Sequence, residues 1–135
     1  MIDDTAILRA DCRNELGEAP LWCQASGTLY WVDVVKPGRV FHWRPAQSAE
    51  DVPDRVDFWD FDDLVTGLNL IDGGGLLVHG KDQLRRFDPA TRDTRPVFAL
   101  PPSDTEMRFN DGHCDPVGRL WVGTMPNNID VWPRK

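Results

Sequence analysis

The segment Gly27-Thr-Leu-Tyr-Trp-Val32 is the clearest indication of the fold, because it recurs twice along the chain. The second copy is Gly74-Gly-Leu-Leu-Val78, and the third is Gly118-Arg-Leu-Trp-Val122. A glycine followed by a short apolar run indicates a tight turn that leads into a strand. The matching leucines lie 47 and 44 residues apart, at Leu29, Leu76 and Leu120. We therefore predict strands at all three copies, with these apolar residues buried: Leu29, Trp31, Leu76, Val78, Leu120 and Val122.

A second repeated segment has nearly the same spacing. Val40-Phe-His-Trp-Arg-Pro45 matches Leu84-Arg-Arg-Phe-Asp-Pro89, displaced by 44 residues. A period in the mid-forties with about four short strands per unit is typical of a β-propeller blade. A β-sandwich or small barrel is the competing architecture, but it would show turn signals without a fixed long period. The repeats therefore predict an all-β fold built from propeller blades.

The whole chain, residues 1–135, fits one partial propeller domain. The predicted blades cover residues 6–62, 63–103 and 104–135, the last incomplete, which makes about two and a half blades. The first begins with a short strand at Ala6–Ala10, and Ile129–Pro133 begins a further copy of the Val40 strand. Natural propellers close with roughly four to eight blades. Open blade edges are therefore expected to favour self-association.

Composition limits the partners and the setting. There are 22 acidic and 15 basic side chains, giving a formal net charge of −7, which argues against nucleic acid and is compatible with divalent cations or neutral small molecules. The segment Met1–Thr5 is acidic where a signal peptide needs positive charge. No apolar run reaches membrane-spanning length. These features predict a cytoplasmic protein without a membrane partner.

The three cysteines, Cys12, Cys23 and Cys114, form no paired framework. Free buried thiols are the common interpretation of such a set. A zinc site made by Cys12, His113 and Cys114 is the alternative.

Glu18 stands out in the segment from Asn14 to Trp22. Pro20 argues against a helix here, and Gly17 permits an unusual backbone beside Glu18. We therefore expect Glu18 on a constrained connection just before the apolar pair Leu21-Trp22. A solvated loop carboxylate is the alternative interpretation.

A second polar segment runs from Arg108 into the third copy of the repeat. Arg108, Asn110, Asp111 and Asp115 fall within eight residues, directly before an apolar strand. Loop residues held on a rigid scaffold often carry function, so this segment is a candidate site. A surface turn is the alternative, because Asp, Asn and Gly tolerate left-handed backbone. For Asp111 and Asp115 the turn role is favoured.

Two motifs give the chain a resemblance to the family of regucalcin (SMP-30), gluconolactonases and luciferin-regenerating enzyme. The motif Leu16-Gly-Glu-Ala-Pro-Leu-Trp22 resembles the family's opening blade. The motif Arg108-Phe-Asn-Asp-Gly112, followed by Asp115–Arg119 and Gly123-Thr-Met125, resembles its most specific internal block. The resemblance covers nearly the whole chain.

The resemblance implies a six-bladed propeller with one divalent cation in its central channel. It implies that Glu18 is a metal ligand and that Arg108 and Asn110 contact substrate. The family's other ligands, an asparagine and an aspartate that also serves in acid–base chemistry, come from later blades, so no catalytic residue is expected within this chain. Some members bind substrate through a glutamate after Gly-Thr-Met. Asn128 stands at the corresponding position and is the third candidate substrate-binding residue.

These residues suit metal-dependent hydrolysis of a sugar lactone, as in gluconolactonases. A divalent cation polarises an ester carbonyl and lowers the pKa of bound water. Oxygen ligands fit calcium, magnesium or manganese, and zinc is also compatible. Glu18 and Asn110 lie nine and eight residues before Gly27 and Gly118, so we predict that both face the centre, with Arg108 adjacent. The alternative function is a non-catalytic or vestigial propeller piece that acts as a binding module.

Overall fold

The structure, a computed structural model, describes residues 11–45, 56–102 and 106–127. Within these ranges the elements are ten β-strands, without an α-helix. The predicted strand segments Ala6–Ala10 and Ile129–Pro133 lie outside them, so the predicted blade limits stay predictions. The strands are β1 (Gly17–Cys23), β2 (Thr28–Asp33), β3 (Gly38–Trp43), β4 (Val56–Phe61), β5 (Val65–Leu70), β6 (Leu76–Gly80), β7 (Gln83–Phe87), β8 (Thr94–Ala99), β9 (Met107–Cys114) and β10 (Leu120–Pro126).

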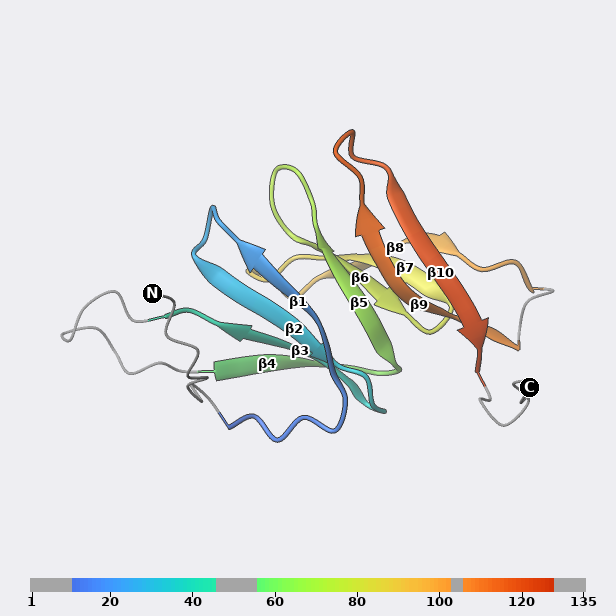
Figure 1. Cartoon of the computed structure of the whole chain (residues 1–135), viewed down its shortest axis with the longest axis horizontal. Coiled ribbons are helices and arrows are strands. Elements are labelled where there is room, and N and C mark those ends of the chain that lie inside the picture. Colours follow the sequence, from blue (N-terminus) through green and yellow to red (C-terminus); the bar gives the residue numbers. More distant parts are fainter. Residues whose placement is uncertain (1–10, 46–55, 103–105, 128–135) are drawn as a thin grey trace, which may run out of the picture.

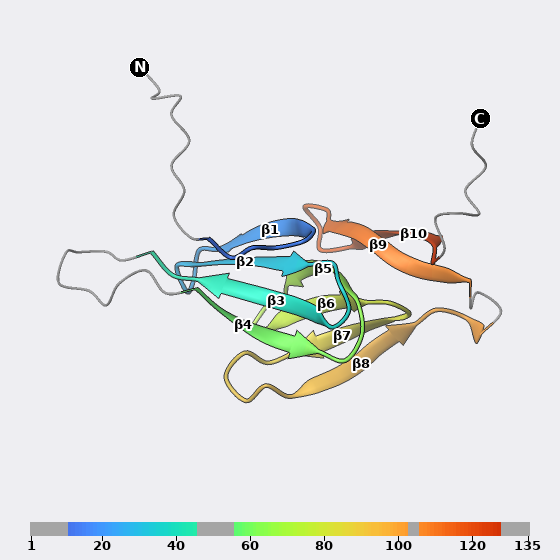
Figure 2. The same cartoon turned by 90° about the horizontal axis from the view of Figure 1, so that it is seen from below.

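The strands form three separate antiparallel sheets in chain order. We call them blade 1 (β1–β4), blade 2 (β5–β8) and blade 3 (β9–β10). The first strands of the blades lie side by side, with β5 between β1 and β9 and in contact with both (Figures 1 and 2). Successive sheets whose first strands lie side by side around a common axis are arranged as propeller blades. The first strands are therefore the innermost ones.

The main core lies between blades 1 and 2. The ring of Phe87 packs edge-on against Trp59 at 5.0 Å and against Phe61 at 5.3 Å between centroids. Blade 1 contributes one face of its strands, and blade 2 contributes the face turned toward it. Each fully buried Val, Leu or Phe side chain contributes about 1.5–3 kcal/mol. The buried residues of this core are Tyr30, Val32, Val40, Phe61, Val65, Leu68, Leu76, Val78 and Phe87.

Blade 3 packs against the opposite face of blade 2. Phe109 on β9 is buried and lies 6.3 Å from the ring of Phe98 on β8. The main-chain N–H of Phe109 donates to the carbonyl of Lys81 at 2.8 Å. Blade 2 thus has one face toward blade 1 and the other toward blade 3.

This alternation corrects the predicted burial. Leu76 and Val78 are buried as expected, each 1% exposed, but Leu29 and Trp31 are only half-buried. All four belong to the same face of their blades, which in blade 2 is covered by blade 1, whereas none of the described sheets covers it in blade 1. Leu120 and Val122 are also half-buried, because the described part of blade 3 has only two strands.

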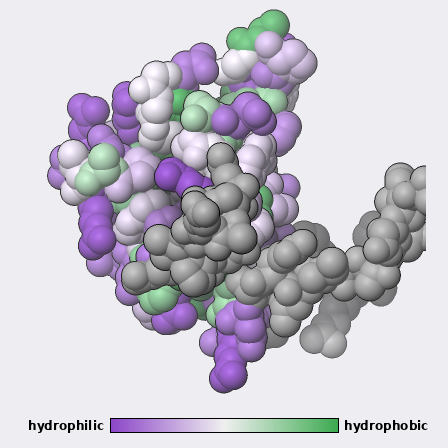
Figure 3. All heavy atoms as spheres, turned by 90° about the vertical axis from the view of Figure 1, so that its left-hand side faces the viewer, coloured by the Kyte–Doolittle hydropathy of each residue, from purple (hydrophilic) through white to green (hydrophobic). Residues whose placement is uncertain are grey.

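The face of blade 1 that is turned away from blade 2 carries an aromatic row. Trp31 stacks on Phe41 at 5.3 Å, and Phe41 contacts Phe58 at the same distance. The guanidinium of Arg39 lies 5.2 Å from the centroid of Phe58, which is 47% exposed. Seen from this end of the molecule, the described residues are mostly hydrophilic, and hydrophobic ones form small separate patches (Figure 3). Self-association through open blade edges stays a prediction.

The described ranges hold no helix with the length and hydropathy needed to cross a membrane. The expected cytoplasmic location and the expected lack of nucleic-acid and membrane partners also stay predictions.

Candidate functional site

Glu18 lies within strand β1, so the predicted connection before a strand is wrong. The ladder between β1 and β2 is interrupted by a bulge between Glu18 and Leu21, and Ala19 has a φ of 51°. Positive φ is uncommon for residues other than glycine, and bulges redirect side chains. Pro20 fits here because a bulge removes the ladder hydrogen bond that it could not donate. The Glu18 side chain is exposed.

A buried carboxylate fixes the segment that leads into β1. Asp33, at the end of β2, is 1% exposed and accepts hydrogen bonds from the main-chain N–H groups of Leu16 at 2.8 Å and Glu15 at 3.3 Å. The carbonyl of Leu16 in turn accepts from Val34 N–H at 2.9 Å. Charge-assisted bonds of this kind are stronger than neutral ones. These bonds fix where the chain enters β1, and so they fix the position of Glu18 along the strand.

The Arg108 motif forms strand β9, which corrects the prediction of a loop. A polar sequence can form this strand because an innermost strand packs against apolar core residues on one side only. Arg108 Nη1 donates to the Phe109 carbonyl at 2.9 Å and lies 3.4 Å from Asn110 Oδ1. Burial lowers the pKa of Arg108 from its usual value, although a guanidinium remains charged. The pair presents a cation and an exposed amide together.

The strand register relates Glu18 to Asn110. Three residues after the repeated leucine, the second strands of blades 1, 2 and 3 carry Val32, His79 and Gly123, which are therefore equivalent positions. Opposite these residues on the innermost strands lie Glu18, Gly67 and the bulge Asn110–Asp111. Glu18 and Asn110 therefore lie at equivalent heights on strands two blades apart. That both side chains face the centre stays a prediction, and Asn128 lies outside the described residues.

Few metal-binding groups gather in this part of the molecule. Among residues 11–45, 56–102 and 106–127, no group of three or more His, Cys, Asp or Glu side chains could hold a metal ion. Cys12, His113 and Cys114 all belong to these ranges, so the alternative zinc site does not form, and the three half-buried cysteines form no disulfide. Glu18 offers a hard oxygen ligand, which fits calcium, magnesium or manganese, but it is one ligand of a larger set.

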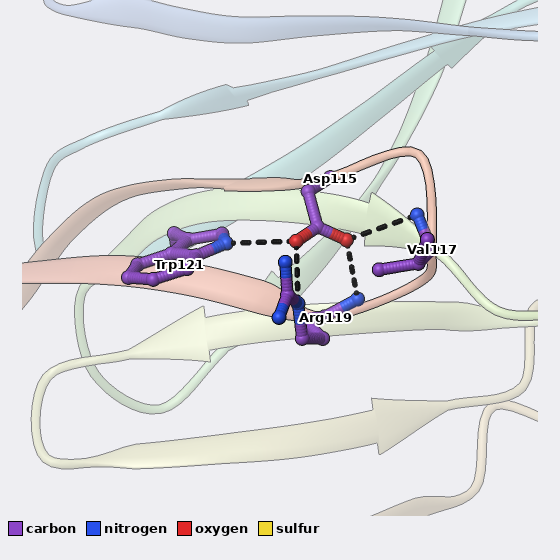
Figure 4. A network of polar contacts seen from close by, with 4 residues as sticks. All are labelled: Asp115, Val117, Arg119 and Trp121. Atoms are coloured by element: carbon purple, nitrogen blue, oxygen red, sulfur yellow. Dashed lines mark hydrogen bonds and ion pairs between the residues drawn. The ribbon is translucent and has the colours of Figure 1, made fainter.

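Asp115 organises the hairpin between β9 and β10 (Figure 4). Its Oδ1 accepts from the N–H groups of Val117 and Arg119, each at 3.0 Å. Its Oδ2 accepts from Arg119 Nε at 2.7 Å and from the Trp121 indole at 3.1 Å. These bonds, above all the one from the Arg119 main chain, lower the pKa of Asp115 to about 2. The structure thus supports a turn-forming role for this residue.

Replacing Asp115 by Asn should destabilise the chain in a pH-dependent way. The folded pKa of about 2 lies below the ordinary value of 3.8, so the carboxylate's contribution is present above that value and is lost as pH falls through 2. We expect Asp115→Asn to lower the urea midpoint at pH 7, and the difference from the wild type to shrink at pH 2. Asp72→Asn, at an exposed position in the β5–β6 turn, is the control. An equal difference at both pH values would contradict the prediction.

Sequence reasoning assigned no role to a buried polar group beneath the innermost strands. His79 on β6 is fully buried, and its Nε2 lies 2.8 Å from Asn69 Oδ1 on β5. Burial lowers the pKa of His79, against the opposing effects of the Asn110 main chain and Asp111, so the ring is neutral at pH 7. One feature of the sequence could have identified it: His79 occupies the repeat position that Val32 holds in blade 1, opposite a glycine of the neighbouring strand.

Comparison with known proteins agrees with the fold. Residues 16–131 match the family described as the SMP-30/gluconolactonase/LRE-like region. The chain is 36% identical over 121 residues to a putative sugar lactone lactonase, YvrE, of Bacillus subtilis, and 33% identical over 124 residues to pentonolactonase XacC of Haloferax volcanii. The matches cover 88% and 92% of this chain and 38% of each relative.

A solved structure shows the same likeness. A calcium-binding protein, regucalcin, from Agrobacterium tumefaciens superposes with a TM-score of 0.67 at 28% identity, over 84% of this chain and 36% of that one. The predicted all-β fold, part of a six-bladed propeller, is confirmed. The chain spans little more than a third of the length of these proteins. With residues 16–131 matching throughout, this chain belongs to the SMP-30/gluconolactonase/LRE-like family.

Proposed function

We propose that this chain supplies one metal ligand and two substrate-binding side chains to a site that hydrolyses a sugar lactone. Glu18 is the ligand, and Arg108 and Asn110 bind the substrate. The observation that supports this most is the register that puts Glu18 and Asn110 at equivalent heights on the innermost strands. The named activities of the relatives, a sugar lactone lactonase and a pentonolactonase, support the substrate class.

The residues divide the work by their chemistry. A divalent cation, when bound, supplies Lewis-acid activation of the ester carbonyl and of water. Glu18 binds it through a carboxylate oxygen, and the calcium-binding relative supports calcium among calcium, manganese, magnesium and zinc. Arg108 donates to a carbonyl or hydroxyl oxygen of the lactone, and the Asn110 amide both donates and accepts. The remaining ligands and the acid–base group come from blades beyond these residues.

A chimeric enzyme tests the proposal. Residues 11–127 of this chain replace the corresponding N-terminal segment of YvrE, and the unaltered parent is the positive control for hydrolysis of gluconolactone and a pentonolactone. We expect metal-dependent hydrolysis by the chimera. Glu18→Gln should lower its activity about 100-fold or more, because a fixed ligand set is lost.

Glu15→Gln is the matched control, since Glu15 is an exposed carboxylate three residues earlier whose main chain alone contacts Asp33. Its activity should match that of the unsubstituted chimera. A folded chimera that is inactive beside an active parent, or that tolerates Glu18→Gln, would show the proposal to be wrong.

A further inference from the structure

Asn110 lies where its strand leaves the ladder. On β9, Phe109 pairs with Thr124 and Gly112 pairs with Val122, so Asn110 and Asp111 together oppose a single residue of β10. A bulge of this kind leaves its main chain without regular ladder bonds. The conformation of Asn110 must therefore be set by groups other than its own sheet.

The neighbouring innermost strand supplies one such group. Thr66 on β5 is 4% exposed, and its Oγ1 lies 3.2 Å from the carbonyl oxygen of Asn110 and 3.3 Å from that of His79. Thr66 itself occupies the bulge of β5, between Val65 and Gly67. The hydroxyl thus lies within hydrogen-bonding distance of a carbonyl in blade 2 and of one in blade 3. The two bulges are thus joined.

The ring of His79 fills the space beneath both strands. A Cβ added to Gly67 would lie 2.8 Å from its Nδ1, and a Cβ added to Gly112 would lie 2.8 Å from its Cε1. These distances are too short for real contacts, so glycine is required on each side of the ring. The bond between Nε2 and Asn69 Oδ1, at 2.8 Å, fixes the ring's orientation. Packing and hydrogen bonding together hold β5, β6 and β9 at this point.

We propose that Thr66 and His79 are positioning residues that hold the Asn110 bulge, and with it the adjacent Arg108 side chain, in the conformation that meets substrate. That Asn110 and Arg108 contact substrate rests on the proposed function, whereas the claim that Thr66 and His79 fix the bulge does not. Thr66 acts through its hydroxyl on the Asn110 carbonyl. His79 acts as a rigid support against which Gly112 closes. A site on the innermost strand is thus fixed from the preceding blade.

The first test uses the ¹⁵N-labelled chain and amide hydrogen exchange at neutral pH. Thr66→Val keeps the shape of the side chain and removes the hydroxyl. We expect exchange at Phe109, whose main-chain N–H donates to the Lys81 carbonyl beside the bulge, to quicken about tenfold, with amide shifts confined to Phe109 and the bulge residues. Thr66→Ser, which restores the hydroxyl, should restore both. Thr124→Val, which removes an exposed hydroxyl on β10, should change neither.

A general loss of stability would look different, since exchange would quicken in the strands of blade 1 as well. Exchange at Phe109 that is unchanged in Thr66→Val, or exchange that quickens equally throughout, would overturn the proposal. If Thr66→Val does not fold, His79→Gln provides the same comparison: it retains an amide donor for Asn69 and loses the ring between the glycines. Local quickening supports the proposal, and its absence opposes it.

The second test separates positioning from the proposed function. In the chimeric enzyme, Thr66→Val should raise KM about fivefold or more with a smaller change in kcat, and Thr66→Ser should return KM to its starting value. A local exchange effect without a change in KM would show that Thr66 fixes the bulge but would refute the claim that this positions the substrate-binding residues. An inactive chimera would count against the proposed function alone, because the exchange result stands independently.

Discussion

The purified chain of 135 residues, supplied with calcium, manganese or zinc, should release acid from gluconolactone no faster than the spontaneous reaction. The physical reason is the ligand count. Glu18 is exposed, and no group of three metal-binding side chains exists in the described ranges. One carboxylate does not hold a divalent ion against water, because metal sites need several ligands in fixed geometry.

The measurement is acid release in a weakly buffered solution, with the mass in solution determined alongside to verify a monomer. The chimeric enzyme with Glu18 intact is the positive control for substrate and metal. Metal-dependent turnover by a verified monomer, abolished by Glu18→Ala, would contradict this expectation. It would also show that the described blades alone complete a catalytic site.

Gly38→Ala should destabilise the chain by about 3 kcal/mol, at the upper end of overpacking effects. Gly38 begins β3 and is buried, and a Cβ there would lie 2.6 Å from Asp63 O and 2.6 Å from Val65 N. Both are main-chain atoms, one in the link after β4 and one at the start of β5, so neither can turn away as a flexible side chain would. The N–H of Gly38 also donates to the Asp63 carbonyl at 3.1 Å. The added methyl group therefore forces blades 1 and 2 apart.

The free energy of unfolding, from urea titration followed by tryptophan fluorescence, checks this result. Gly123→Ala on β10 is the matched control. A Cβ there would have its nearest neighbour at 3.8 Å, which is ordinary contact, so a change within about 0.5 kcal/mol is expected. Equal effects of the two substitutions would show that the close approach at Gly38 does not determine the packing of the blades.

The repeat was sufficient to predict the blades, but it did not predict which side chains are buried. Leu29 and Leu76 hold the same place in the repeat, yet only Leu76 is buried. Burial of that face depends on a preceding blade, which is a property of the neighbouring sheet and absent from local sequence. Strand identity is encoded within each unit, whereas burial is decided between units.

Likewise, the sequence pointed to the candidate residues that lie in contiguous motifs but not to a contact made between blades. Glu18, Arg108 and Asn110 belong to contiguous motifs and were identified from them, although their segments were expected to be connections instead of strands. Turn-forming residues such as Gly112 and Pro20 suggested loops, but the bulges of innermost strands accommodate the same residues. Thr66 was not identified, because Asn110, whose carbonyl lies near its hydroxyl, is 44 residues further along the chain. A contact across blades leaves no local pattern.

The two-faced packing of the blades has a consequence for synthesis on the ribosome. Tyr30 and Val32 emerge before the side chains that cover them, which extend to Phe87 at the end of β7. A nascent chain that contains only blade 1 therefore exposes both of its faces, and blade 1 gains its first partner only when most of blade 2 has been made. Folding during translation then proceeds in steps of one blade, each delayed by one repeat. Codons that slow the ribosome within β5–β7 would prolong the period in which blade 1 has no partner.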